Sequence, residues 1–283
     1  MSRTDLKTLV STDWLADQIG EPDLRVLDAS WYLPAQNRDP KAEYAESHIP
    51  GARFFDIDAV SDSNSDLPHM APPVEKFMSR MRALGVGDGH RVVVYDGAGL
   101  FSAARVWWLF RHMGQDNIAV LDGGLPKWIA EGRPTESTAP VIRDRHMTAT
   151  RNPALVKDVT QVALASKLNQ AEIIDARAAE RFRGDAPEPR QGLRAGHIPN
   201  SKNVPFTTLL NEDKTMKSPL ELASIFEAAG VDLDRPIITS CGSGVTAAVL
   251  SLALEIIGHR DHALYDGSWT EWGSYDDLKV EQG

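Results

Sequence analysis

The sequence contains a single cysteine, Cys241, among its 283 residues. A chain with one cysteine cannot form an internal disulfide, which excludes a secreted disulfide scaffold and indicates a reducing compartment. One cysteine also cannot build a structural zinc site, and no group of histidines and cysteine has the spacing of metal ligands. Nor does the chain contain a G-x-G-x-x-G or P-loop motif. We therefore expect neither a metal nor an organic cofactor.

Basic runs and long apolar runs are also missing. The net charge is −10, and a nucleic-acid surface needs clustered Lys and Arg, so we expect no nucleic-acid partner. No apolar run approaches the roughly 20 residues of a membrane span, and the first residues lack the apolar core of a signal peptide. With 42% hydrophobic and 25% charged residues, the composition is typical of a soluble globular protein. We interpret the chain as cytoplasmic.

An internal repeat organises the sequence. The same order of short motifs occurs twice, about 145 residues apart, which predicts two related domains in tandem. The matching positions are Asp28 and Asp175, His48 and His197, Asp96 and Cys241, and Trp128 and Trp272. Both histidines stand in a His-Ile-Pro segment, and their presence in both halves indicates a role in the fold rather than in catalysis.

Each half alternates short runs rich in β-branched residues with amphipathic segments of helical length. Residues 220–229 are one such segment, preceded by Ser218-Pro219 and followed by Gly230. This alternation predicts parallel strands covered by helices, which is an α/β fold. A stretch rich in Pro, Thr and charge separates the halves, so we place domains at 1–140 and 158–283 with a linker at 141–157.

Cys241 lies between the apolar run 237–239 and the helical stretch 247–257. A strand, a glycine-rich turn and a helix start would direct backbone N–H groups and the positive end of the helix at one sulfur. Such surroundings lower the pKa of a cysteine from about 8.5 into the range of roughly 3.5–7.5, whereas the alternative is a small buried hydrophobic side chain. The first half has Asp96 at the matching position and keeps both loop glycines. We therefore assign the nucleophile to the second domain and a supporting role to the first.

The loop Cys-Gly-Ser-Gly-Val-Thr-Ala, the paired His-Ile-Pro segments and the Tyr-Asp-Gly-Ser segment at residues 265–268 resemble the two-domain rhodanese-type sulfurtransferases, and within them those that use 3-mercaptopyruvate. The resemblance covers nearly the whole chain. It implies two tandem rhodanese-like domains, each a mainly parallel sheet flanked by helices, with the site in the cleft between them. Thiosulfate-using relatives typically carry basic residues after the cysteine, whereas residues 242–244 are uncharged here.

The resemblance also implies roles for individual residues. The Cys241 thiolate attacks the sulfur of the donor, pyruvate leaves, and the persulfide passes its outer sulfur to a small thiol, a thioredoxin-like protein or cyanide. Asp58 orients His69, which exchanges a proton with Ser243. The substrate-binding residues that it implies are Arg181, Arg190, Gly242, Gly244, Val245 and Thr246.

Purely structural roles remain open for these residues. The arginines could belong to a solvated basic loop, His69 to a surface loop, and Asp58 to a turn or a helix cap. Three other functions also remain: thiosulfate:cyanide sulfur transfer, a cysteine phosphatase, and a non-catalytic persulfide carrier or interaction module. A phosphatase loop would end in an arginine that grips phosphate, but Ala247 and Ala248 stand at that place.

Overall fold

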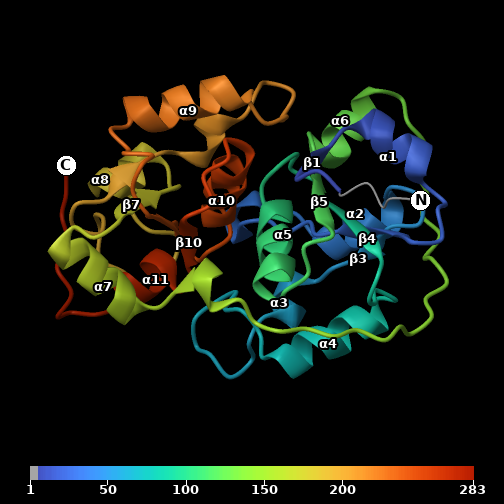
Figure 1. Cartoon of the computed structure of the whole chain (residues 1–283), viewed down its shortest axis with the longest axis horizontal. Helices are drawn as coiled ribbons and strands as arrows, with labels where there is room; N and C mark the ends of the chain where they lie inside the picture. The colour runs from blue at the N-terminus through green and yellow to red at the C-terminus, as the bar shows by residue number, and fades with distance from the viewer. Residues whose placement is uncertain (1–5) are drawn as a thin grey trace. The chain divides into compact units, whose positions relative to one another are not determined.

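The computed structural model describes residues 6–283, which fold into two compact units (Figure 1). The first comprises the described residues up to Ser61, Pro72–Arg151 and Asn211–Met216. The second comprises Asp62–Ala71, Asn152–Leu210 and Lys217–Gly283. The main change of unit, between residues 151 and 152, lies inside the predicted linker 141–157, while residues 1–5 of the predicted first domain lie outside the described part. Each unit also takes in one short segment from the other half of the chain.

The two units have the same sheet. The first has five strands in the order β1-β5-β4-β2-β3, and the second has β6-β10-β9-β7-β8. Every pairing is parallel. The strands are β1 (Leu9–Val10), β2 (Leu24–Asp28), β3 (Arg53–Phe54), β4 (Arg91–Tyr95), β5 (Ile118–Leu121), β6 (Val156–Lys157), β7 (Glu172–Asp175), β8 (Lys202–Asn203), β9 (Ile237–Ser240) and β10 (His262–Tyr265). The prediction of parallel α/β sheets is confirmed.

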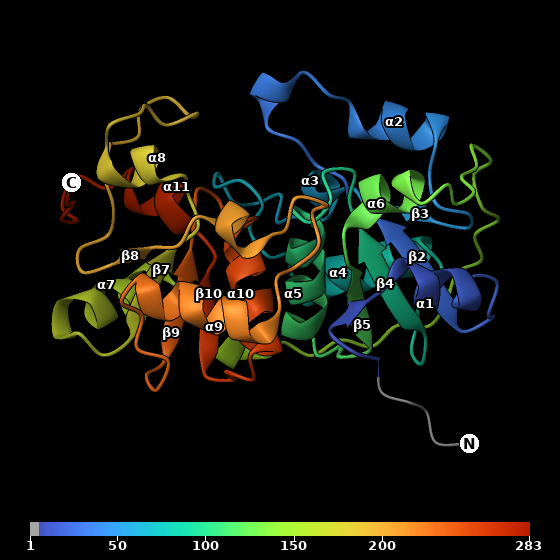
Figure 2. The same cartoon turned by 90° about the horizontal axis from the view of Figure 1, so that it is seen from above.

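Helices cover both faces of each sheet. In the first unit α1 and α6 lie on one side of the sheet and α4 on the other, and in the second unit α9 lies opposite α7 and α11 (Figure 1). Figure 2 shows α5 beside β4 and α10 beside β9 and β10. The helices are α1 (Thr12–Gln18), α2 (Pro40–Glu46), α3 (Ile57–Val60), α4 (Val74–Ala83), α5 (Ala103–His112), α6 (Gly124–Ala130), α7 (Val159–Leu168), α8 (Ala179–Arg183), α9 (Pro219–Ala228), α10 (Ala247–Ile256) and α11 (Ser268–Trp272), with 3-10 turns η1 (Pro34–Gln36), η2 (Pro153–Leu155) and η3 (Phe206–Leu209). In the described part of the chain, every helix is too short or too polar to span a bilayer.

The strands have apolar side chains on both faces of the sheet, and helices bury both faces. Val26 and Tyr95 of the first unit pack in one cluster with Leu15 of α1 and Trp128 of α6. Side chains alternate between the two faces of a strand, so the intervening residues are left for the opposite face, where α4 and α5 pack edge to face through Phe77 and Phe110. Buried side chains of this size each contribute about 1.5–3 kcal/mol to stability.

The two His-Ile-Pro histidines occupy equivalent buried positions. The backbone of His48 pairs with Glu136 in an antiparallel bridge, and the backbone of His197 pairs with Glu281 in the same way. Each Nδ1 donates to a carbonyl oxygen, of Tyr44 at 2.6 Å and of Phe182 at 2.8 Å, and each ring stacks on that same aromatic residue. This equivalence agrees with the structural role that the repeat indicates.

The exchanged segments are held by equivalent hydrogen bonds. In the second unit Asp266, which follows β10, accepts the backbone N–H of Ala71 through Oδ2 at 2.8 Å. In the first unit Asp122, which follows β5, accepts the backbone N–H of Met216 through Oδ1 at 2.8 Å. The repeat offset relates both the aspartates and the donors. The exchange is therefore a property of the repeated fold, and it makes residues 62–71 part of the second unit.

Replacing these aspartates should loosen different segments. A hydrogen bond to a charged acceptor is worth about 1.5–3 kcal/mol, so we expect Asp266→Ala to expose residues 62–71 to a non-specific protease about tenfold more often. Asp122→Ala should expose residues 211–216 instead. Mapping the first cleavage sites by mass spectrometry checks this, and identical cleavage patterns in the two variants would contradict it.

Candidate active site

Cys241 begins the loop between β9 and α10, as the strand, turn and helix pattern predicts. β9 is fully buried, and α10 is composed of Ala, Leu and other residues that favour helices. Gly244 turns the loop with a φ of 77°, a conformation that L side chains rarely adopt. Cys241 carries a free thiol and is 2% exposed. The fold therefore places the sulfur at the carboxyl edge of a parallel sheet, where α/β proteins bind ligands.

Hydrogen bonds from the start of α11 fix the loop backbone. The N–H of Cys241 donates to the hydroxyl of Ser268 at 3.2 Å, and this hydroxyl donates to the carbonyl of Tyr265 at 2.8 Å. The carbonyl of Cys241 accepts from the N–H of Trp269, and that of Gly242 accepts from the N–H and hydroxyl of Thr270. These hydrogen bonds hold the backbone on both sides of the Cys241 side chain, which is the kind of support that positions a functional group.

The sequence analysis missed Ser268. Its φ is 50°, a left-handed conformation that is uncommon for a residue other than glycine. The matching residue of the first unit is Gly124, with a φ of 55°, and a Cβ there would lie 2.6 Å from the carbonyl oxygen of Asp96. The second unit thus places a hydroxyl against the backbone N–H of Cys241, where the first unit has no side chain. The available signal was the change from Asp-Gly-Gly to Asp-Gly-Ser between the halves.

The loop of the first unit shows what this geometry binds. The carboxylate of Asp96 is buried and accepts four backbone N–H groups at 2.8–2.9 Å. The donors are Ala98 in the first half of the loop, Phe101 and Ser102 at its end, and Ala103 at the start of α5. The loop of the second unit is one residue shorter. Counted from Cys241 for the first amide and from the helix start for the other three, the corresponding amides are those of Ser243, Val245, Thr246 and Ala247. Loops of this form collect N–H groups around an anion, which in the second unit would be the sulfur of Cys241.

His69 and Ser243 meet inside the second unit. The Nδ1 of His69 lies 3.0 Å from the Oγ of Ser243, and the two residues are 5% and 6% exposed. His69 has a φ of 62°, a backbone strain of the kind found at functional sites. The exchanged segment therefore brings a histidine to Ser243, two residues after Cys241. A hydrogen bond between these groups can move a proton at the mouth of the loop.

Arg181 lies against the loop glycine. A Cβ on Gly242 would stand 3.2 Å from the Nη2 of Arg181, so the glycine permits the close approach of this guanidinium. Arg181 also donates through Nη2 to the Oε2 of Glu188 at 2.5 Å. Arg190, Val245 and Thr246, the other predicted contacts, lie in the same unit, with Val245 buried and Thr246 preceding α10.

Glu188 and Arg177 are not among the residues predicted from the sequence, although Glu188 lies between the predicted Arg181 and Arg190. The Oε1 of Glu188 accepts from Arg177 at 2.8 Å, and its side chain is 3% exposed. Burial opposes the charge of Arg177, but Asp175 and then Glu188 outweigh this cost and raise the pKa of its guanidinium. The formal charges of these two arginines and two carboxylates cancel. Arg181 can therefore donate hydrogen bonds to a ligand, while the group as a whole carries little net positive charge.

Asp58 lies in α3 of the first unit. Its Oδ2 accepts from the indole N–H of Trp31 at 3.2 Å, and it lines a cavity of about 270 Å³ beside Trp31 and Lys41. Its predicted partnership with His69 stays a prediction. Within residues 6–283, no three His, Cys, Asp or Glu side chains are grouped so that they could hold a metal ion.

Comparison with known proteins decides the family. The pattern described as "Rhodanese-like domain" matches residues 11–131 and 160–275, one match in each half. This chain belongs to the rhodanese family. The prediction from its motifs is thereby confirmed, with two rhodanese-like domains as the origin of the repeat.

Similar rhodanese proteins match nearly the whole chain. The 3-mercaptopyruvate sulfurtransferase of Escherichia coli K12 is 48% identical over 96% of this chain and 97% of its own length. Thiosulfate/3-mercaptopyruvate sulfurtransferase 1, mitochondrial, of Arabidopsis thaliana is 44% identical over 96% of this chain and 78% of its own length. The crystal structure of SseA from E. coli, described as showing the rhodanese fold and the catalytic mechanism of 3-mercaptopyruvate sulfotransferases, is 45% identical, has a TM-score of 0.86 and covers 93% of this chain and 99% of its own.

The amide-lined loop can be tested by giving the second unit the anion of the first. We expect Cys241→Asp to be inactive but more stable than Cys241→Ala by about 1–2 kcal/mol, because its carboxylate would accept the loop amides as Asp96 does. The melting temperature should rise by about 2–4 °C or more, and the gain should disappear below about pH 4, where the carboxyl group protonates. A Cys241→Asp variant less stable than Cys241→Ala at pH 7 would contradict an anion-binding loop.

Proposed function

We propose that this rhodanese is a 3-mercaptopyruvate sulfurtransferase that carries sulfur as a Cys241 persulfide. The observation that supports this most directly is the amide-lined loop around Asp96 in the first unit, because the equivalent loop of the second unit has Cys241 in place of that carboxylate. A site that stabilises a buried anion favours a thiolate nucleophile and then a persulfide anion. Sequence identity to a 3-mercaptopyruvate sulfurtransferase over nearly the full length of both chains supports the same reaction.

The first half-reaction breaks one carbon–sulfur bond and forms one sulfur–sulfur bond. The Cys241 thiolate attacks the donor sulfur, and the electron pair of the carbon–sulfur bond passes to the leaving group as the enolate of pyruvate. The proton of the donor thiol then transfers to the enolate carbon, giving pyruvate and a persulfide anion. The hydrogen-bonded pair of His69 and Ser243 is the proposed route for this proton.

The charges of the site favour a carboxylate-bearing thiol over thiosulfate. Residues 242–244 provide no cation beside the sulfur, and Glu188 neutralises Arg181, whereas a dianionic donor needs net positive charge. Arg181 and Arg190 are proposed to bind the carboxylate and keto oxygen of the donor through their N–H groups. The Arabidopsis relative is named for both donors, so thiosulfate is the alternative donor to test.

In the second half-reaction an acceptor removes the outer sulfur and restores the thiolate. The proposed acceptors are a small thiol, a thioredoxin-like protein or cyanide, each of which provides a nucleophile for the outer sulfur. We propose a cytoplasmic location from the single cysteine, while the Arabidopsis relative is named as mitochondrial.

Intact-protein mass spectrometry tests the proposed reaction. Mixing the protein with 3-mercaptopyruvate without an acceptor should add the mass of one sulfur atom at Cys241 and release one pyruvate per chain. Cys241→Ser should show neither. In steady state, kcat/KM for 3-mercaptopyruvate should exceed that for thiosulfate by about tenfold or more. A preference for thiosulfate would show that thiosulfate, not 3-mercaptopyruvate, is the donor. Turnover without a persulfide would contradict the proposed route, which requires the donor to reach Cys241 although this residue is 2% exposed.

Two substitutions should separate proton transfer from donor binding. His69→Gln should lower kcat about 10²–10⁴-fold with little change in KM, the range typical of general acid–base groups. Arg190→Lys should instead raise the KM for 3-mercaptopyruvate about tenfold, because lysine lacks the planar fork that binds a carboxylate. The exposed His146→Gln and Arg183→Lys are matched controls that should change neither constant. A His69→Gln variant with wild-type kcat would remove His69 from the proton route.

A further inference from the structure

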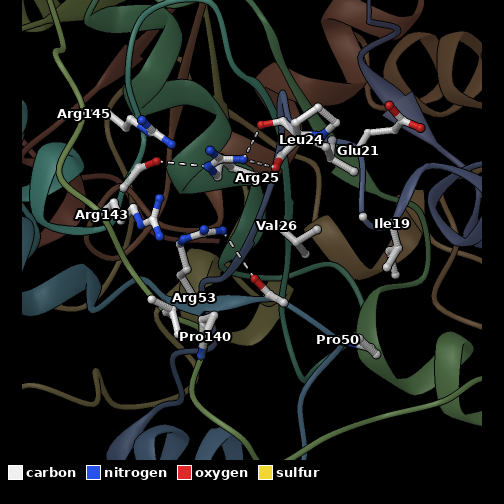
Figure 3. A pocket seen from close by; sticks show the side chains of 15 residues that line it. Ile19, Glu21, Leu24, Arg25, Val26, Pro50, Arg53, Pro140, Arg143 and Arg145 are labelled. Carbon is white, nitrogen blue, oxygen red and sulfur yellow. Dashed lines mark hydrogen bonds between the residues drawn. The ribbon is translucent and has the colours of Figure 1, made fainter.

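Four arginines of the first unit surround a cavity of about 460 Å³ that is remote from the reactive loop in sequence. They are Arg25 at the start of β2, Arg53 in β3, and Arg143 and Arg145 in the segment after α6. Figure 3 shows their guanidinium groups gathered on one side of the cavity. Arg25 stands near the amino end of β2, whereas the loop of Asp96 follows the carboxyl end of β4. Arg53 begins the two-residue strand β3.

The hydrogen bonds recorded for the two strand arginines are to backbone carbonyl oxygens. Arg25 donates to Gly85 at 3.0 Å and to Leu24 at 2.7 Å, and Arg53 donates to Gly51 at 3.3 Å. The Nε of Arg53 is buried without a hydrogen-bond partner. Among residues 6–283, no carboxylate forms an ion pair with any of the four arginines. The structure thus orients the cations but does not neutralise them.

The acidic lining of the cavity does not balance this set. Among the described residues that line the cavity, only Glu21 is acidic, and Figure 3 shows its carboxylate turned away from the guanidinium groups. Burial lowers the pKa of Arg25 and the charge of Arg145 lowers it further, which together outweigh the opposite effect of Asp23. Burial likewise lowers the pKa of Arg53, and Arg25 adds to the effect. Charges of one sign therefore repel one another here, in a chain whose net charge is −10.

The second unit provides an internal control for this edge of the sheet. Arg53 pairs in register with Leu27, and Lys202 pairs in register with Ile174, which is the repeat equivalent of Leu27. By the same alignment Glu172 stands where the first unit has Arg25.

Glu172 neutralises its own surroundings. Its side chain is 5% exposed and forms ion pairs with Lys202 and with Arg235, the latter at 2.6 Å. The first unit has Arg25 in place of this buried acid, and Arg25 lines the cavity. A buried cation without a partner is costly, so the missing negative charge must come from outside the chain.

We propose that this cavity binds a small molecule carrying a phosphate monoester. A tetrahedral dianion can accept N–H forks from several guanidinium groups at once, whereas a single carboxylate is filled by one or two. The wall across from the arginines includes Ile19, Val26 and Pro50, which suits an apolar or aromatic body (Figure 3). The volume falls within the 300–1,000 Å³ that is typical of small-molecule sites.

Calorimetric titration of the full chain at low ionic strength tests the proposal. The probes are adenosine monophosphate, inorganic phosphate, adenosine and citrate. We expect adenosine monophosphate to bind more tightly than inorganic phosphate, and adenosine to show no binding. The double variant Arg143→Gln/Arg145→Gln should weaken the binding of adenosine monophosphate about tenfold or more, since each charge-assisted hydrogen bond to phosphate is strong. Both positions are exposed, so the variant should fold.

A matched double variant separates specific binding from the overall charge. Arg80→Gln/Arg82→Gln removes the same two charges from exposed positions of α4 and should change the affinity by less than about twofold. A second variant, Arg25→Glu, supplies the acid of the second unit and should abolish binding. Equal losses in the two double variants, binding of citrate as tight as that of adenosine monophosphate, or no binding of any phosphate probe would each overturn the proposal.

Discussion

The reactive loop depends on one constraint, which is that buried backbone N–H groups converging after a parallel strand require an acceptor. In the first unit the carboxylate of Asp96 provides that acceptor with four hydrogen bonds. The second unit repeats the strand, the glycine turn and the helix start but has Cys241 at the equivalent position. The same geometry that holds a permanent anion in one unit is therefore available for a reactive one in the other. The first loop is informative because its anion is inert and its contacts are visible.

Backbone N–H groups of the exchanged segments are also satisfied, outside the reactive loop. Asp266 and Asp122 each receive a backbone N–H from the opposite half of the chain, and the exchanged residues His69 and Lys214 both have left-handed backbones, with φ of 62° and 68°. In the first unit a Cβ on Gly99 would lie 2.4 Å from the Cβ of Lys214, and in the second the ring of His69 meets Ser243. The two units thus share a scaffold and differ at single positions. The second has the His69–Ser243 contact that we propose for proton transfer, and the first has a packing contact at the equivalent place.

The two units also differ in buried charge at the equivalent positions Arg25 and Glu172, where buried cations rather than buried N–H groups require a partner. A buried acid, Glu172, balances the basic residues of the second unit, whereas Arg25 at the matching position adds to the cations of the first. Because burial penalises an unpaired charge, a change of sign at one buried position changes the charge balance of the side chains around it. The repeat lets each arrangement serve as the reference for the other. Charge at a conserved backbone position, rather than a change of fold, distinguishes the two units.

Local patterns in the sequence were sufficient to predict the alternating strands and helices, the duplication, and the strand, turn and helix around Cys241, because hydrophobic periodicity and glycine placement act over a few residues. The roles of His69, Asp58 and the arginines rested on resemblance alone. Only the tertiary structure decided that His69 reaches Ser243 across 174 residues of chain, that Glu188 and Ser268 support the loop, and that four arginines share one cavity. Such pairings depend on strand register, on the exchanged segments and on which charges are buried together. No pattern within a short window contains that information, because it arises when distant residues are excluded from water in the same place.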